Sequence, residues 1–111
     1  MVMKVDNFKA VYKILSTLEK SMDYPEMDLM PLIGAEKLGV SQERWNCYIE
    51  MMMDVGYIKG VQMKRYVTGE LNIDVSDIRI TLKGLEYLQE NTFMRKAYNA
   101  LKGIEEIVPG I

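Results

Sequence analysis

The sequence contains no histidine among its 111 residues. Without histidine, the chain lacks the usual base of Ser-His and Cys-His catalytic pairs and a common nitrogen ligand of protein-bound metals. The glycine-rich patterns that hold phosphates, GxxxxGK[ST] and GxGxxG, are absent as well. We therefore expect a protein that is not an enzyme, needs no cofactor or metal and has no small-molecule substrate.

Cysteine and long apolar runs are also scarce. The single Cys47 cannot form a disulfide within the chain, which favours a reducing environment. No apolar run approaches the ~20 residues that cross a membrane, and residues 1–5 are too short and too soon polar for a secretory signal. The sequence therefore predicts a cytoplasmic protein without membrane contact.

Positive charge is not in excess, since 14 Lys and Arg residues stand against 16 Asp and Glu residues, for a formal net charge of −2. A protein that grips many DNA phosphates usually carries net or locally dense positive charge, so any DNA-binding surface here must be a local patch. With 49% hydrophobic and 27% charged residues, the chain is typical of a globular domain. Its length predicts one domain over residues 1–104, followed by a loose C-terminal tail at residues 105–111.

The most informative stretch is residues 35–80, where a short helix, a glycine turn, a longer helix and a hairpin are expected in that order. Ala35–Leu38 predicts the short helix, and Gly39 can adopt the left-handed backbone that ends it. Ser41 is a good N-cap for the longer helix, expected over residues 42–55. The spacing Ala-x-x-x-Gly-Val-Ser resembles a helix-turn-helix signature.

The segment after this helix mixes apolar and polar residues in alternation and predicts a hairpin. Its turn is expected at Val67–Glu70, which contains a glycine, and a bulge or bend near Ser76-Asp77 is expected to interrupt the alternation. A helix-turn-helix followed by a hairpin is the order of a winged helix. The predicted fold class is α+β and mostly helical: a winged helix-turn-helix with a two- or three-stranded antiparallel wing and extra C-terminal helices.

Further elements are predicted before this stretch. A first helix is expected over residues 7–22, with Asp6 as its N-cap. Its apolar residues follow helical spacing: Phe8, Val11, Tyr12, Leu15, Leu18 and Met22. Residues 29–33 are expected to supply a short first strand.

Two helices are predicted after the hairpin. Thr81 is a good N-cap for the fourth helix, in which Gly84 is expected to pack close to a neighbouring backbone. A joint at Asn91-Thr92 separates it from a fifth helix. Apolar residues at helical spacing mark the fifth helix: Phe93, Ala97, Tyr98, Leu101 and Ile104. Basic residues mark its other side: Arg95, Lys96 and Lys102.

In the helix at residues 42–55, one apolar stripe is expected to face the core: Trp45, Tyr48, Ile49 and Met52. Trp45 is therefore interpreted as a core residue rather than a base-stacking one. The three consecutive methionines at residues 51–53 cannot all face the core at helical spacing. Met51 or Met53 is therefore expected to be partly exposed and available for a subunit contact.

The second helix of a helix-turn-helix enters the major groove, and side chains near its N-terminus face the base edges. The residues expected there are Gln42, Glu43, Asn46 and Cys47. Gln and Asn match adenine, and Glu can accept a hydrogen bond from cytosine. The helix is acidic, with Glu43, Glu50 and Asp54 against Arg44 alone, which disfavours contact with phosphates.

The hairpin is more basic, because Lys59, Lys64 and Arg65 stand against Glu70. Lys64, Arg65 and Tyr66 are expected to straddle a phosphate backbone, with Tyr66 against a sugar. The alternative is an edge hairpin whose charges only protect it from aggregation. The predicted contacts to double-stranded DNA are therefore Gln42, Arg44, Asn46, Lys64, Arg65 and Tyr66.

Two functions fit this sequence. The first is a winged-helix DNA-binding protein. The second is a protein-interaction module that does not bind DNA, in which the acidic helix and exposed methionines meet a partner or a second copy of the chain in a homodimer. The contact residues expected for the second function are Glu50, Met51 and Met53.

Further patterns cover nearly the whole chain: VYKIL at residues 11–15, LEKSMDY at 18–24, EKLGVS at 36–41, RW at 44–45, GYIKG at 56–60 and RITLKGLEYL at 79–88. These stretches resemble the YjcQ family of small winged-helix proteins from bacterial and prophage genomes. The resemblance implies the fold, a phage or prophage setting and a nucleic-acid role, such as that of a small transcriptional regulator. It implies no particular catalytic or binding residues.

Overall fold

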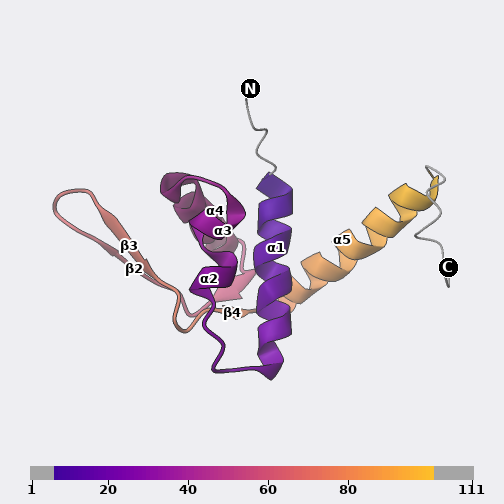
Figure 1. Ribbon diagram of the computed structural model, residues 1–111, viewed down its shortest axis with the longest axis horizontal. Coiled ribbons are helices and arrows are strands. Elements are labelled where there is room, and N and C mark those ends of the chain that lie inside the picture. The colour runs from indigo at the N-terminus through magenta and orange to yellow at the C-terminus, as the bar shows by residue number, and fades with distance from the viewer. Residues whose placement is uncertain (1–6, 102–111) are drawn as a thin grey trace.

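The computed structural model describes residues 7–101, with side chains described for residues 7–91. The elements in chain order are α1 (Asn7–Lys20), the 3-10 helix η1 (Ser21–Asp23), α2 (Met30–Ile33), α3 (Ala35–Leu38), α4 (Gln42–Asp54), β1 (Ile58–Lys59), β2 (Gln62–Arg65), β3 (Leu71–Asp74), β4 (Arg79–Ile80) and α5 (Leu82–Leu101). The fold is α+β and mostly helical, as predicted, and its two small antiparallel sheets are compatible with a winged-helix-like fold (Figure 1). Asp6 and the tail at residues 105–111 lie outside the described residues. Among the helices of the described part, none has both the length and the apolar character needed to span a membrane.

α1 runs through the middle of the molecule in Figure 1 and contacts α2, β4 and α5. Its buried side chains are Ala10, Ile14, Leu15 and Leu18. Of the apolar residues noted at helical spacing, Leu15 and Leu18 are buried. Phe8 and Met22 are not part of the buried stripe, because their side chains are 75% and 58% exposed. Phe8 lies before the buried stripe begins at Ala10, and Met22 lies in η1, where the α-helix has already ended.

The strand predicted for residues 29–33 is wrong, because Met30–Ile33 forms the short helix α2. Pro31 stands in the first turn of α2, where a residue without an N–H forfeits no helical hydrogen bond. Gly34 follows in an extended conformation and separates α2 from α3. The chain therefore crosses this side of the core as two short helices instead of a strand.

α3 and α4 are two helices joined by a turn, at the place where the sequence predicts a helix-turn-helix. Gly39 ends α3 with a φ of 73°, in the left-handed region that favours glycine. The Ser41 hydroxyl accepts a hydrogen bond from the Arg44 N–H at 3.1 Å and caps the start of α4. The start of α4 and its N-cap are therefore those that the sequence predicted.

Trp45 anchors α4 in the core, as predicted. Its side chain is only 1% exposed, and its indole N–H donates to the Ile33 carbonyl at 2.7 Å. This carbonyl lies at the end of α2, so a single side chain joins α4 to α2 through both packing and a hydrogen bond. Tyr48, Ile49 and Met52 complete the buried stripe of α4.

The strands form two antiparallel pairs, β1 with β4 and β2 with β3. Between the pairs, Gly60 passes so close to Asp77 that an added Cβ would lie 2.0 Å from the Asp77 carbonyl oxygen. The Ile78 N–H donates to the Val75 carbonyl at 3.1 Å and closes a turn. The bend predicted near Ser76-Asp77 is therefore confirmed. Beyond it, β2, β3 and their connecting turn, called the wing below, project from the body (Figure 1).

α5 is one continuous helix from Leu82 to Leu101, so the joint predicted at Asn91-Thr92 is wrong. The Asn91 side-chain amide donates to the Tyr87 carbonyl one turn earlier at 2.8 Å and so lies along the helix without breaking it. Thr81 caps the helix as predicted, because its hydroxyl accepts from the Gly84 N–H at 3.1 Å. The side chains of Arg95 and Lys96, and the whole of Lys102, lie outside the described residues.

Gly84 is where α5 meets the sheet, and its replacement by alanine is expected to destabilise the fold. An added Cβ would lie 2.5 Å from the Tyr57 carbonyl oxygen and 2.6 Å from Ile80 Cγ1, so backbone must move. We expect Gly84→Ala to lower the free energy of unfolding in urea by about 1–3 kcal/mol, although alanine favours helices. Glu86→Ala, an exposed change in the same helix, is the control. A stabilised Gly84→Ala variant would contradict this close approach.

Candidate nucleic-acid interface

The first turn of α4 carries the residues that the sequence predicts at base edges. Gln42 and Glu43 are exposed, as is Cys47 one turn later. The Gln42 side-chain amide donates to the Asn46 side-chain oxygen at 3.0 Å, so these two predicted base readers form a pair. The pair keeps a carbonyl acceptor on Gln42 and an amide donor on Asn46, which is the combination that matches an adenine edge.

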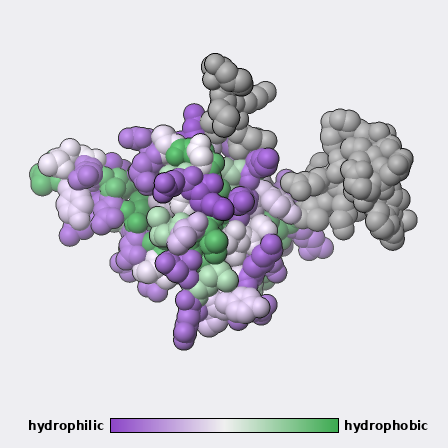
Figure 2. All heavy atoms as spheres, in the orientation of Figure 1, coloured by the Kyte–Doolittle hydropathy of each residue, from purple (hydrophilic) through white to green (hydrophobic). Residues whose placement is uncertain are grey.

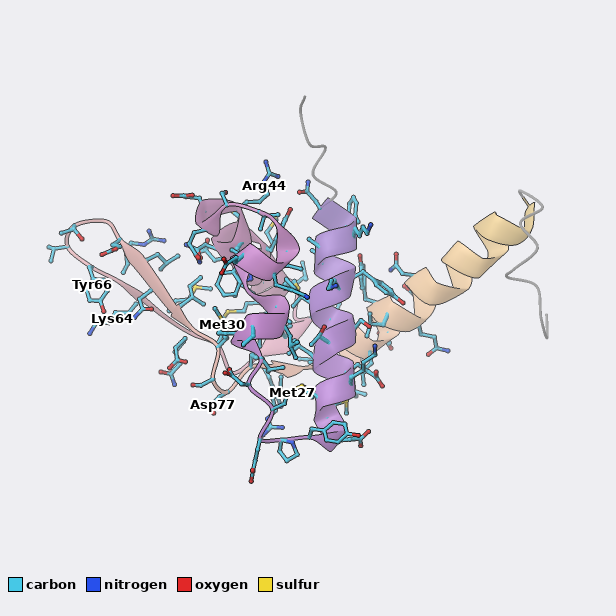
Figure 3. All side chains as sticks on the ribbon, in the orientation of Figure 1. Met27, Met30, Arg44, Lys64, Tyr66 and Asp77 are labelled. Carbon is cyan, nitrogen blue, oxygen red and sulfur yellow. The ribbon has the colours of Figure 1, made fainter. Side chains whose placement is uncertain are left out.

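Arg44 lies on another side of α4. Its Nη1 donates to Asn7 Oδ1 at 3.0 Å, and the Tyr48 hydroxyl donates to the same oxygen. Arg44 is therefore held toward the start of α1. In Figure 3 it lies at the upper end of α4, apart from Lys64 and Tyr66 on the wing. The structure thus does not bring Arg44 together with the predicted wing contacts.

The three predicted wing residues divide between two faces of the hairpin, because adjacent strand residues point in opposite directions. The Lys64 ammonium lies 5.4 Å from the centre of the Tyr66 ring, a cation–π distance. Arg65 lies on the other face, where its Nη2 is 3.9 Å from Glu50 Oε2 of α4. Lys64 and Tyr66 therefore form one exposed contact pair, and Arg65 is turned toward α4.

The Arg65–Glu50 ion pair is solvent-exposed, with side chains 61% and 42% exposed, so it contributes little to stability. Its effect is electrostatic, because it neutralises one positive charge of the wing and one negative charge of α4. Glu43 and Asp54 remain exposed on α4. Figure 2 shows hydrophilic side chains over much of the body on this face, whereas the wing carries both hydrophilic and hydrophobic side chains.

A second basic pair lies at the root of the wing. Lys59 of β1 is directly opposite Arg79 of β4 in the strand register, and both are exposed. Their neighbours Ile58 and Ile80 are buried, so the two cations share the outer face of this sheet. Lys59 is among the basic hairpin residues predicted from the sequence, whereas Arg79 is not. The alternation Ile78-Arg79-Ile80 was the available signal, because it places the arginine opposite the core.

Asp74 ends β3 and holds the bend behind the wing. Its carboxylate accepts from the Ser76 hydroxyl at 2.7 Å and from the Ser76 N–H at 2.9 Å. These bonds favour the charged form, so they lower the pKa of Asp74 below its ordinary value. Asp74 therefore stabilises the fold above its ordinary pKa, and this contribution is lost as the pH falls through the lowered value.

Ser76→Ala tests this arrangement, because it removes the hydroxyl donor and leaves the backbone donor in place. The pKa of Asp74 is expected to rise toward its ordinary value in an NMR titration of the carboxyl group, and the loss of stability between neutral and acid pH should become smaller. Ser76→Thr keeps the hydroxyl and serves as the control. An unchanged pKa in Ser76→Ala would show that the hydroxyl does not act on Asp74.

The residues predicted for protein contact are not on one surface. Met51 is 53% exposed and lines a groove of about 700 Å³ between α1, α4 and the start of α5, called the α1–α4 groove below. The main apolar side chains of the groove are Phe8, Val11, Met51, Val55, Tyr57 and Tyr87. Met53 is partly buried against the core, and Glu50 faces Arg65. Only Met51 of the predicted three therefore belongs to an apolar surface.

Comparisons with known proteins identify a family. Neither the curated proteins nor the solved structures gave a significant match. The model of the family described as YjcQ protein matches residues 12–107, which is most of the chain and includes α3, α4, the wing and α5. The chain therefore belongs to the YjcQ family.

Proposed function

We propose that this YjcQ-family protein binds double-stranded DNA through the start of α4 and the wing, and acts as a small transcriptional regulator in a phage or prophage setting. The observation that carries the proposal is the pairing of an exposed α4 start, which follows a glycine turn, with a hairpin that projects from the body (Figure 1). This combination supports a helix that enters the major groove and a wing that reaches the neighbouring backbone.

Base contacts are assigned to the Gln42–Asn46 pair. The hydrogen bond between the two side chains fixes their relative position before DNA arrives, which reduces the entropy lost on binding. The free acceptor and donor of the pair suit adenine. Arg44 keeps guanidinium N–H groups beyond the one bound to Asn7, and these are available to a phosphate near the start of α4.

Phosphate contact is assigned to Lys64, with Tyr66 against a sugar. Both side chains are exposed on the same face of the wing. Because Arg65 is partly neutralised by Glu50 and α4 is acidic, few phosphates can be engaged by each copy of the chain. The proposed binding is therefore weak in the absence of a matching sequence and strongly dependent on salt.

A titration of mixed-sequence duplex DNA at two salt concentrations tests the proposal. If one copy contacts about three phosphates, raising the salt from about 50 to 200 mM weakens binding by about fortyfold, because condensed counterions are released. Binding that appears at low salt and fades in this way supports the proposal. An absence of binding at low salt and micromolar protein would overturn it.

The second candidate function is a protein-interaction module without DNA binding. The acidic surface of α4 favours it, because Glu43 and Asp54 are exposed there and would repel phosphates. Glu50 and Met53 are engaged within the chain, so Met51 is the remaining predicted contact. In this case the duplex titration shows no binding even at low salt.

A further inference from the structure

The α1–α4 groove leaves large apolar side chains uncovered. Phe8, Met51 and Val55 line it and are 75%, 53% and 47% exposed. Apolar side chains gathered around one hollow indicate an interaction site, whereas single exposed apolar residues are ordinary. Tyr87 of α5 also lines the groove, and its ring centre lies 4.9 Å from that of Tyr57. The groove therefore ends at the root of α5.

α5 then leads away from the groove. Its 20 residues span about 30 Å, and in Figure 1 its far end lies apart from every other helix and strand drawn. An isolated stretch of about ten helical residues is marginally stable in water, so contact with a partner would stabilise this half of α5. Because α5 is continuous through Asn91, it cannot turn back into the groove of its own chain.

Charge identifies a second copy as the suitable partner. Beyond Asn91, the sequence of α5 contains Arg95 and Lys96 and no acidic residue. Glu43 and Arg44 of α4 both line the groove and offset each other, while Glu50 and the exposed Asp54 leave α4 acidic as a whole. Opposite charges on the two helices favour the approach of α5 from one copy to α4 of another.

We propose that two copies of the chain form a symmetric dimer in which α5 of each copy lies in the α1–α4 groove of the other. The same contact is made twice, as in other isologous dimers, and the doubling brings the buried area toward the roughly 1,200 Å² that stable interfaces reach. The dimer uses the side of α4 with Cys47, Met51 and Val55. Neither the Gln42–Asn46 pair nor the wing lines the groove, whereas Arg44 does. The dimer does not depend on DNA binding, although it would share Arg44 with the proposed DNA contact.

The first test is the mass of the full-length protein in solution. We expect twice the mass of one chain at high protein concentration, and a single-chain mass for Met51→Glu, which places a charge in the groove. Met22→Glu is the matched control, since Met22 is 58% exposed and lies outside the groove. It should dimerise normally. Circular dichroism checks that both variants fold. A wild-type monomer, or a dimer that persists in folded Met51→Glu, would overturn the proposal.

Cys47 supplies a second test, because it is exposed in one copy and lines the groove. Its rate of modification by a maleimide should fall as the protein concentration rises, by about tenfold when about 90% of the chains are dimeric and only the monomer reacts. In Met51→Glu the rate should not depend on concentration. A dimer whose Cys47 reacts as fast as in the monomer would place the interface elsewhere and overturn the proposal.

The identity of the occupant is tested by a disulfide between copies. Asn99→Cys adds a thiol to the far half of α5, and mild oxidation should join it to Cys47 of the other copy. Gln89→Cys, near the root of α5, should cross-link much less, and Cys47→Ser should abolish the cross-link. Equal cross-linking of both introduced cysteines would contradict the placement of α5. None of these readouts involves DNA, so the proposed function and the dimer can fail separately.

Discussion

Trp45→Ala is expected to destabilise the protein by about 3–5 kcal/mol, the range for truncating a large buried aromatic side chain. Trp45 is 1% exposed, and it lies in the same core cluster as Ile14 of α1 and Ile33 of α2. Its replacement opens a cavity among three helices. It also removes the indole donor from the Ile33 carbonyl, which is 2.7 Å away, and a buried acceptor without a partner adds to the loss.

Urea unfolding followed by far-UV circular dichroism measures this effect, since the variant has no tryptophan to report by fluorescence. Trp45→Phe separates the two contributions, because it keeps most of the apolar volume and loses the donor. It is expected to destabilise by about 1–3 kcal/mol. Tyr24→Ala removes a 62% exposed aromatic side chain and should change stability by less than about 0.5 kcal/mol. If Trp45→Ala were as mild as Tyr24→Ala, α4 would not be anchored by this residue.

Lys64→Glu is expected to weaken duplex affinity by about tenfold at low salt, because one phosphate contact is lost and a repulsive charge is added. Lys64→Ala should weaken it less and reduce the slope of the salt dependence by about 1. Both effects should be the same for different duplex sequences, since a phosphate contact does not read bases. Titrations of two unrelated duplexes measure this.

Glu50→Gln is expected to change duplex affinity in the opposite direction. It removes the carboxylate that lies 3.9 Å from Arg65 and frees the guanidinium for phosphate, so duplex affinity should rise. Because the ion pair is exposed, the stability of the fold should change little. If Lys64→Glu and Glu50→Gln both left the affinity unchanged, the wing would not belong to a DNA-binding site.

The parts of the fold that depend on short-range signals were predictable. Gly39 and Ser41 define the turn and the cap of the helix-turn-helix through residue type alone. The apolar spacing from Trp45 to Met52 identifies the buried stripe of α4 without knowledge of its neighbours. The close packing of Gly84 also followed from its position in the first turn of a helix, where glycine otherwise lowers helix propensity.

The predictions were wrong where the same local sequence is compatible with two different structures. The stretch at residues 29–33 is apolar and contains Pro31, which is compatible with an extended segment and equally with the first turn of a helix. Asn91 is a poor helix former, yet its amide bonds to the Tyr87 carbonyl within α5. In each case the packing of neighbouring elements determines the local structure, and a short stretch of sequence does not reveal that packing.

The sequence proposes a set of candidate contact residues but does not show which of them share a surface. Lys64 and Arg65 both contribute positive charge to the hairpin sequence. Because adjacent strand residues alternate in direction, their side chains lie on opposite faces of the wing. The contacts of Arg44 with Asn7 and of Arg65 with Glu50 join positions far apart in the chain, so no local pattern indicates them. The α1–α4 groove likewise needs three helices in place before it exists.

The proposed contact of DNA with the start of α4 and the wing can be tested residue by residue in an NMR titration of the ¹⁵N-labelled protein with a short duplex, since each backbone amide reports its own surroundings. We expect the largest shift changes on Gln42, Asn46 and residues 64–70, and these changes should disappear at high salt. Shift changes confined to the groove residues Phe8, Val11, Met51 and Val55, or no changes at low salt, would contradict the proposal.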